Sequence, residues 1–249
     1  EELMDKYFSG EDFTYAEMIQ GLRAGVKDLS LFPVVCGSAV TGLGTRMLLD
    51  IIVELLPSPL EGRPLMGENE KGELDEFVPS PGALPVAYVW KTVSDQYGKY
   101  SYVKVMSGNI KPDMQMINAR TGATEKLGRL YVMKGKKAEE VKELECGDIG
   151  AIGKMDKVKT GDTLCDAKNI VRLHGMDYAQ PCYSRAISPK TKQEIEKLGT
   201  GLNKLNEEDP TFSVTNNAET HQTVISGAGD IQIDVLCSKL KSRFGVDSE

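Results

Sequence analysis

The sequence contains few of the residues from which metal sites and disulfide frameworks are built. Among its 249 residues are five cysteines and two histidines. The cysteines are widely scattered without a C-x-x-C spacing, and neither His174 nor His221 has a Cys or His neighbour at ligand spacing. Because zinc sites and disulfide-rich folds need such clusters, we predict reduced thiols and no metal site.

A long apolar run is also missing. A membrane-spanning helix needs about 18–20 apolar residues, and the longest run here, residues 47–56, is interrupted by Asp50 and Glu54. The acidic start EELM is typical of neither a signal peptide nor a transit peptide. We therefore predict a cytoplasmic chain without membrane contact. The abrupt start predicts an internal piece of a longer protein.

The motifs of common catalytic sites are absent from the sequence as well. No G-x-x-x-x-G-K-[ST] phosphate loop occurs, and residues 42–46 (GLGTR) lack the lysine that reaches the β- and γ-phosphates of a nucleotide. Residues 227–229 (GAG) precede a predicted helix, but Gln232 replaces the third glycine of a dinucleotide-binding turn. Residues 203–206 (NKLN) end in Asn where a guanine-reading N-K-x-D has Asp. We predict no catalytic residue.

What is present is an ordinary globular composition with an uneven charge. Hydrophobic residues make up 40% and charged residues 27% of the chain. The net charge is −7, yet residues 83–168 carry 15 Lys/Arg against 11 Asp/Glu. Contact with a polyanion is therefore expected in this middle segment.

The first predicted unit, residues 1–60, combines helices with one buried strand. Thr14 and Glu17 form a capping box before a helix that we expect Gly25 to end. Residues 31–36 (LFPVVC) are continuously apolar, as in a strand buried on both faces, and residues 48–55 have helical spacing. The unit is predicted to be the edge of an α/β sheet whose other strands lie outside this sequence.

A Pro/Gly/Glu-rich stretch, residues 61–82, is predicted as a linker between this unit and a second one. Residues 83–170 contain short Val- and Tyr-rich runs separated by turn signals such as Ser107-Gly108 and Thr160-Gly161-Asp162. Many short strands without helical spacing predict a small closed β-barrel.

The third predicted unit, residues 178–249, alternates strands and helices in the order β-α-β-β-α. Thr191 and Glu194 are spaced as a second capping box, and Gly245 is expected to stop the second helix. This order predicts a ferredoxin-like split βαβ domain, with a fourth strand beginning at residues 246–248 or beyond them. The predicted fold class is thus multidomain α+β.

Two short segments are candidate binding sites. Gly37, Ser38 and Ala39 follow the apolar strand, and their small side chains let backbone N–H groups approach a carbonyl such as guanine O6. An ordinary strand-to-loop turn has the same composition.

The second segment is the basic loop with Lys134, Lys136 and Lys137, which suits contacts to RNA phosphates. A solvated loop without a partner fits the same charge. Tyr97, Tyr100 and Tyr102 could stack on bases, although packing on the barrel is the expected role.

Motifs in all three units, in one order, resemble the bacterial translation elongation factor G family of translational GTPases. They are residues 33–39 (PVVCGSA), 55–59 (LLPSP), 105–108 (VMSG), 160–165 (TGDTLC), 188–192 (SPKTK), 205–212 (LNEEDPTF) and 225–230 (ISGAGD). The resemblance covers nearly the whole chain. It identifies the first unit as the C-terminal end of the GTPase domain, with Ser38 and Ala39 in its last guanine-contacting motif, and the others as the second and third domains.

The resemblance implies a monomeric factor that binds ribosomal RNA and protein and promotes movement of tRNA and mRNA. It implies GTP and Mg²⁺ in the parent protein, but neither bound to nor hydrolysed by this piece. Residues 95–99 (DQYGK) lack the family's usual Asp-Pro, and residues 230–232 (DIQ) replace its usual Glu-Leu-His. A ribosomal-protection-type paralogue, or a non-catalytic module that binds RNA or the ribosome, stays open as an alternative.

Overall fold

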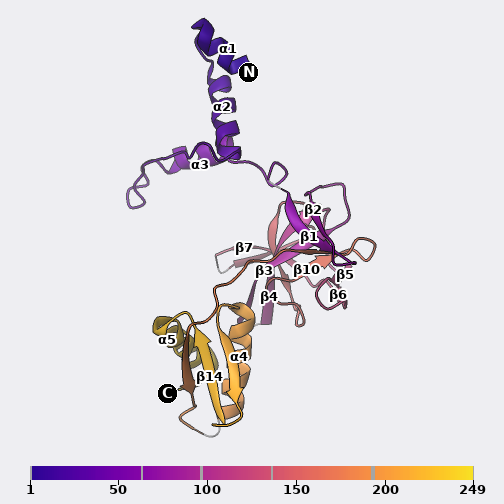
Figure 1. Ribbon diagram of the computed structural model, residues 1–249, viewed down its shortest axis with the longest axis vertical. Helices are drawn as coiled ribbons and strands as arrows, with labels where there is room; N and C mark the ends of the chain where they lie inside the picture. Colours follow the sequence, from indigo (N-terminus) through magenta and orange to yellow (C-terminus); the bar gives the residue numbers. More distant parts are fainter. Residues whose placement is uncertain (1, 63, 96–97, 136, 192–193, 249) are drawn as a thin grey trace. The chain divides into compact units, whose positions relative to one another are not determined.

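The computed structural model describes residues 2–62, 64–95, 98–135, 137–191 and 194–248. The chain divides into two compact units, residues 1–63 and 64–249, and each is described by itself. Figure 1 shows helices alone in the first unit, and sheets with the remaining helices in the second.

The first unit contains helices α1 (Glu2–Ser9), α2 (Tyr15–Lys27) and α3 (Thr45–Leu55). The predicted capping box is confirmed, because Thr14 and Glu17 satisfy each other's backbone N–H groups at the start of α2. The prediction that Gly25 ends this helix is wrong. The helix continues to Lys27, and the chain leaves it through the C-cap Asp28.

The predicted strand at residues 31–36 is also wrong, since the structure has a loop there. Phe32 is 73% exposed and Val34 is 88% exposed. A strand exists only where a second strand accepts and donates its backbone hydrogen bonds. The first unit has no strand pair among its described residues, so an apolar run with strong β-propensity stays unpaired.

The stretch predicted as a linker contains a β-hairpin made of β1 (Leu65–Asn69) and β2 (Leu74–Phe77). Strand β11 (Val171–Leu173) pairs with β1 and completes a three-stranded antiparallel sheet. Phe77 and Val171 of this sheet pack on the buried Val86 and Cys165 of the neighbouring sheet. The prolines and glycines thus mark turns of the second unit rather than a free connector.

The middle of the chain is an antiparallel sheet of eight strands in the order β6-β5-β10-β3-β4-β9-β7-β8. Their bounds are β3 (Val86–Asp95), β4 (Gly98–Ser107), β5 (Gln115–Asn118), β6 (Thr124–Lys126), β7 (Leu130–Lys134), β8 (Lys137–Val141), β9 (Ile149–Gly153) and β10 (Thr163–Cys165). One continuous core of Val, Ile, Leu and Met side chains fills its inner side.

The expected ring of strands is not closed by hydrogen bonds. Within the described residues no ladder joins the outermost strands β6 and β8. An isolated bridge between Ile110 and Leu144 links the segments after β4 and before β9. We describe the module as a barrel-type sheet, because its single inner core is that of a small barrel.

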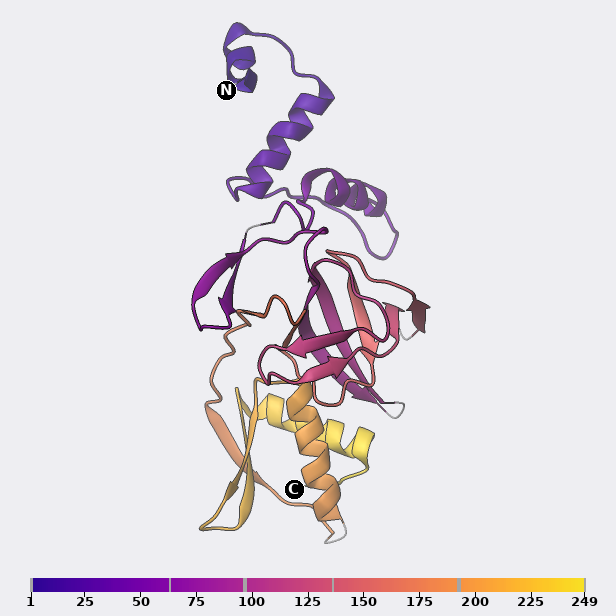
Figure 2. The same ribbon diagram turned by 90° about the vertical axis from the view of Figure 1, so that its right-hand side faces the viewer.

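The C-terminal module has the expected β-α-β-β-α order. It comprises β12 (Tyr183–Ile187), α4 (Ile195–Glu208), β13 (Ser213–Asn217), β14 (Gln222–Gly227) and α5 (Asp230–Lys239), which continues into the π-helical turn η2 (Leu240–Phe244). The sheet order is β12-β14-β13, and α4 and α5 cover one face of it (Figure 2). An isolated bridge joins Pro189 to Ser248, which places residue 248 beside β12 as a ferredoxin-like fold requires.

The ends of these helices test two sequence predictions. Gly245 adopts a left-handed conformation with φ 66° and caps η2, so the predicted stop is confirmed. The second capping box is wrong, because α4 begins after Glu194, which makes no side-chain capping bond. Thr191 accepts the Glu194 N–H through its backbone carbonyl instead.

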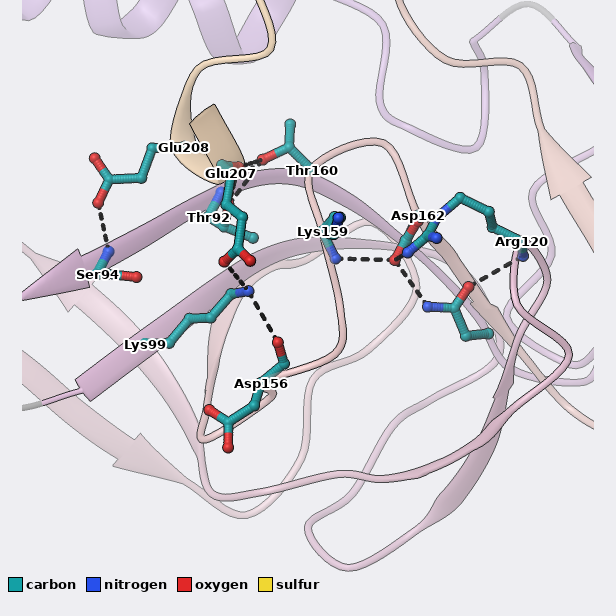
Figure 3. A network of polar contacts seen from close by, with 11 residues as sticks. Thr92, Ser94, Lys99, Arg120, Asp156, Lys159, Thr160, Asp162, Glu207 and Glu208 are labelled. Atoms are coloured by element: carbon teal, nitrogen blue, oxygen red, sulfur yellow. Dashed lines mark hydrogen bonds and ion pairs between the residues drawn. The ribbon is translucent and has the colours of Figure 1, made fainter. Parts of the chain in front are cut away.

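A buried carboxylate holds the turn before β10 (Figure 3). Asp162 is 2% exposed and accepts hydrogen bonds from Arg120 at 2.5 and 2.9 Å, from Asn118 Nδ2 at 2.8 Å and from the Lys159 N–H at 2.9 Å. Burial by itself would raise the pKa of Asp162, but the hydrogen bonds, led by that from Arg120, outweigh it and lower the pKa. The carboxylate is therefore charged at neutral pH.

We predict that Asp162→Asn destabilises the chain by about 2 kcal/mol, because a neutral amide replaces the buried charged acceptor of Asn118 Nδ2, the Lys159 N–H and Arg120. The folded-state pKa of Asp162 is lowered, so its stabilisation is complete above the unfolded pKa of about 3.9 and is lost as the pH falls further. Urea unfolding measured between pH 7 and pH 2.5 should show that the free energy of unfolding falls less steeply with acid in this variant than in the wild type.

The matched control is Asp113→Asn, which removes a carboxylate from the exposed pair with Lys126. Asparagine tolerates the left-handed backbone of residue 113, so this variant should lose no more than about 0.5 kcal/mol. Equal losses in both variants would contradict the role given to Asp162.

Candidate functional site

The predicted guanine-contacting residues lie on the loop between α2 and α3. Gly37, Ser38 and Ala39 line a depression of about 270 Å³ together with residues around the start of α3. The Ser38 N–H donates to the Leu43 carbonyl at 2.9 Å, and the Ser38 carbonyl accepts from the Gly42 N–H at 2.8 Å. These bonds close the loop on itself, so the Ser38 N–H does not point freely into the depression.

Two glycines allow this loop to close. A Cβ on Gly37 would lie 2.9 Å from the Leu43 carbonyl oxygen, and a Cβ on Gly44 would lie 2.8 Å from that of Cys36. Gly44 also has φ 81°, a conformation that favours glycine. The loop therefore needs both glycines, which explains their pattern in the sequence through backbone packing alone.

The predicted basic loop is the turn between β7 and β8. Lys134 ends β7 and Lys137 begins β8, while Lys136 lies outside the described residues. Both described lysines pair with Glu139, at 2.6 Å from Lys134 and 3.1 Å from Lys137, and lower its pKa. All the same, both side chains are more than 60% exposed and remain accessible to an anion.

The aromatic candidates share the outer face of the barrel-type sheet. Tyr100 and Tyr102 alternate with buried residues of β4, and Tyr97 lies outside the described residues. The Tyr102 ring packs edge-to-face on Trp90, and the Tyr100 ring packs in the same way on Tyr131. Packing on the barrel, the expected role, accounts for these contacts.

A polar joint that the sequence analysis missed connects the barrel-type sheet to the end of α4 (Figure 3). The last carbonyls of an α-helix have no partner within the helix. The carbonyl of Glu207 accepts from the hydroxyls of Thr92 at 2.6 Å and Thr160 at 3.2 Å. Lys99, which is only 8% exposed, pairs with the Glu207 carboxylate at 2.7 Å. Hydroxyls and a cation from the sheet thus cap this helix.

The next residue of the helix extends the joint. The Glu208 carboxylate accepts from the Ser94 N–H at 2.6 Å and from two nitrogens of Arg243 at 2.8 and 3.0 Å. Arg243 also donates to the Ser94 carbonyl. The guanidinium therefore bridges η2, α4 and β3. Thr92 and Glu207 are 115 residues apart, so no local pattern in the sequence could have revealed the joint.

Other features of the described residues point to no chemistry. They contain no group of three or more His, Cys, Asp and Glu side chains placed to hold a metal ion. Cys36 and Cys182 are exposed, and all five cysteines are free thiols. In the same part of the chain, every helix is too short or too polar to cross a bilayer.

Two family models match the chain. Residues 98–165, most of the barrel-type sheet, match the model "Elongation factor Tu domain 2". Residues 178–249, the C-terminal module, match the model "Elongation Factor G, domain III".

Whole-chain similarity agrees with these matches. Curated proteins named elongation factor G from Ureaplasma parvum serovar 3 and Ureaplasma urealyticum serovar 10 are each 36% identical over 99% of this chain. A crystal structure of a Thermus thermophilus protein superposes with a TM-score of 0.80 and 26% identity over 100% of this chain, which covers 35% of that one. The chain spans 36% of the length of the two curated relatives.

Domain order, domain type and identity along nearly the full sequence agree, and the chain belongs to the elongation factor G family, of which it carries an elongation factor Tu-type domain 2 and a domain III.

Proposed function

We propose that this chain is the ribosome-contacting part of a GTP-driven factor that promotes tRNA and mRNA translocation in the cytoplasm. The observation that carries the proposal is the 36% identity to elongation factor G over 99% of the chain, spanning both matched domains. The proposed partners are ribosomal RNA and ribosomal protein, and the chain acts as a monomer. A ribosomal-protection-type or other paralogous GTPase is the second candidate, favoured by Gln232 in place of the family's usual histidine.

GTP and Mg²⁺ belong, in this proposal, to the whole factor rather than to these 249 residues. Residues 37–39 would contribute the guanine-facing rim of the site. The sequence has no lysine-bearing phosphate loop, and most of the free energy of nucleotide binding comes from groups that hold the phosphates.

We expect isothermal titration calorimetry of the 249-residue chain with GTP and Mg²⁺ to show no tight binding. The dissociation constant should be above about 1 mM. EDTA should leave the result unchanged. A Mg²⁺-dependent affinity in the micromolar range would contradict the assignment of a partial site.

The basic hairpin is the proposed RNA contact. Phosphate contacts by lysines release counterions, so each one steepens the salt dependence of binding. The double variant Lys134→Gln/Lys137→Gln should therefore weaken ribosome binding and lower the slope of log affinity against log salt by up to about 2. Pelleting with ribosomes between 50 and 200 mM KCl measures both quantities.

Two matched variants make this test specific. Glu139→Gln frees both lysines from their internal partner and should strengthen binding. Lys71→Gln removes an exposed lysine from the turn between β1 and β2, outside the barrel-type sheet, and should have no effect. Uniform weakening by all lysine variants would instead indicate non-specific attraction.

The joint at the end of α4 is proposed to make domain 2 and domain III move and unfold together. Glu208→Gln should weaken it by about 2–4 kcal/mol, because Arg243 and the Ser94 N–H lose a charged acceptor. Thermal unfolding should then split into two transitions.

The control Asp234→Asn removes an exposed carboxylate 3.6 Å from Arg185 within domain III and should keep the wild-type profile. An unsplit transition in Glu208→Gln would show that the joint does not couple the domains.

A further inference from the structure

A polar cavity lies on the outer side of the barrel-type sheet, at the end of β7 opposite to the basic hairpin. Its volume is about 460 Å³, which is within the range of small-ligand sites. It is lined by Pro112, Asp113, Gly128, Arg129, Tyr131, Gly153 and Lys154. Two of these residues were described above, Asp113 in the exposed pair with Lys126 and Tyr131 in the ring contact with Tyr100.

Bare backbone forms part of the wall of this cavity. Gly128 crosses Gly153 so closely that a Cβ on Gly128 would lie 2.1 Å from the Gly153 carbonyl oxygen. A Cβ on Gly153 would lie 3.4 Å from the Tyr131 ring. At Gly128 the missing side chain allows this backbone crossing, and at Gly153 it leaves one edge of the Tyr131 ring uncovered.

The aromatic wall is held in place from the neighbouring strands. Tyr102 of β4 and Tyr131 of β7 both lie opposite Ala151 of β9, and Tyr100 lies opposite Gly153. Because β9 carries only small residues at these positions, the Tyr100 and Tyr131 rings meet across it, with centroids 5.8 Å apart. Tyr131 is therefore a pre-positioned ring beside the cavity, which lowers the entropy cost of stacking.

The charged groups at the cavity favour an anion. The Lys154 side chain is exposed and forms no ion pair with the residues that the structure describes. Arg129 is 3.2 Å from Glu140 in an exposed pair, which solvent weakens. Asp113, the one carboxylate among the lining residues, is in a similarly exposed pair with Lys126 at 2.8 Å, so two cations and one carboxylate line the cavity.

We infer that this cavity binds one unstacked nucleotide of an RNA strand, with its base against Tyr131 and its phosphate between Arg129 and Lys154. Aromatic side chains combined with cations are the usual elements of single-strand recognition. Tyr131 and Lys134 are three residues apart on one strand, so their side chains point to opposite faces of β7. The cavity and the basic hairpin are therefore two separate proposed contacts. The inference deepens the proposed ribosome contact and rests on it.

The test is fluorescence anisotropy of a fluorescein-labelled ten-nucleotide uridine RNA with the 249-residue chain. Tyr131→Leu removes the stacking ring, and Lys154→Asn removes the cation while tolerating the left-handed φ of 62°. Each should weaken RNA binding at least about fivefold. The controls Tyr183→Leu and Lys71→Gln, which remove an exposed ring and an exposed cation elsewhere, should change it less than about twofold.

The RNA and free-nucleotide sources are separated by competition with UMP. Displacement of the labelled RNA only at millimolar UMP supports a site for one unit of a strand. Displacement by micromolar UMP would assign the cavity to a free nucleotide and overturn the RNA inference. Unchanged RNA binding in both Tyr131→Leu and Lys154→Asn, with wild-type urea unfolding midpoints, would overturn the site altogether.

Ribosome pelleting distinguishes this inference from the proposed function. Loss of binding in Lys134→Gln/Lys137→Gln, with Tyr131→Leu and Lys154→Asn unaffected, would keep the hairpin as the ribosome contact and reject the cavity. Loss in the cavity variants alone would keep the cavity and reject the hairpin. Loss in both sets is the result we expect.

Discussion

The arrangement of domain III depends on the free end of one helix. The carbonyl of Glu207 has no partner within α4 and accepts instead from the hydroxyls of Thr92 and Thr160 on the barrel-type sheet. An unpaired carbonyl in this half-buried place would cost about 1–3 kcal/mol. The helix is therefore complete only while the sheet is in contact with it. Lys99 adds a positive charge at the negative end of the helix dipole.

The same turn of the sheet serves stability and this joint. Thr160 donates to the Glu207 carbonyl, and two residues later the buried Asp162 accepts from Arg120 and the Lys159 N–H. The buried carboxylate thus fixes the backbone that presents the threonine to α4. Loss of the Asp162 charge should therefore weaken the contact of domain III with the barrel-type sheet as well as the sheet itself, because Thr160 is only two residues from Asp162.

Local signals in the sequence predicted the elements whose stability is local. The Thr14 capping box, the Gly245 stop and the β-α-β-β-α order depend on neighbours a few residues apart, and the structure contains them. The prediction of a strand at residues 31–36 was wrong because a strand needs a partner, and the described part of the first unit supplies none. The joint and the cavity could not be predicted from the sequence for a related reason, because each is formed by residues that are far apart along the chain. Charge singled out Lys134 and Lys137, whose side chains are exposed, but did not show that Glu139 binds both.

The departure at Gln232 also has a physical reading. Its amide oxygen accepts from the Ala228 N–H at 2.7 Å, and its amide nitrogen donates to Thr211 Oγ1 at 2.7 Å. The side chain therefore ties the glycine turn before α5 to the segment before β13. A histidine could provide one acceptor and one donor there only in its neutral form, whereas an amide provides both at every pH. The substitution keeps the link between the two segments and removes its sensitivity to protonation, as expected of a family member that has diverged at this turn without losing its packing.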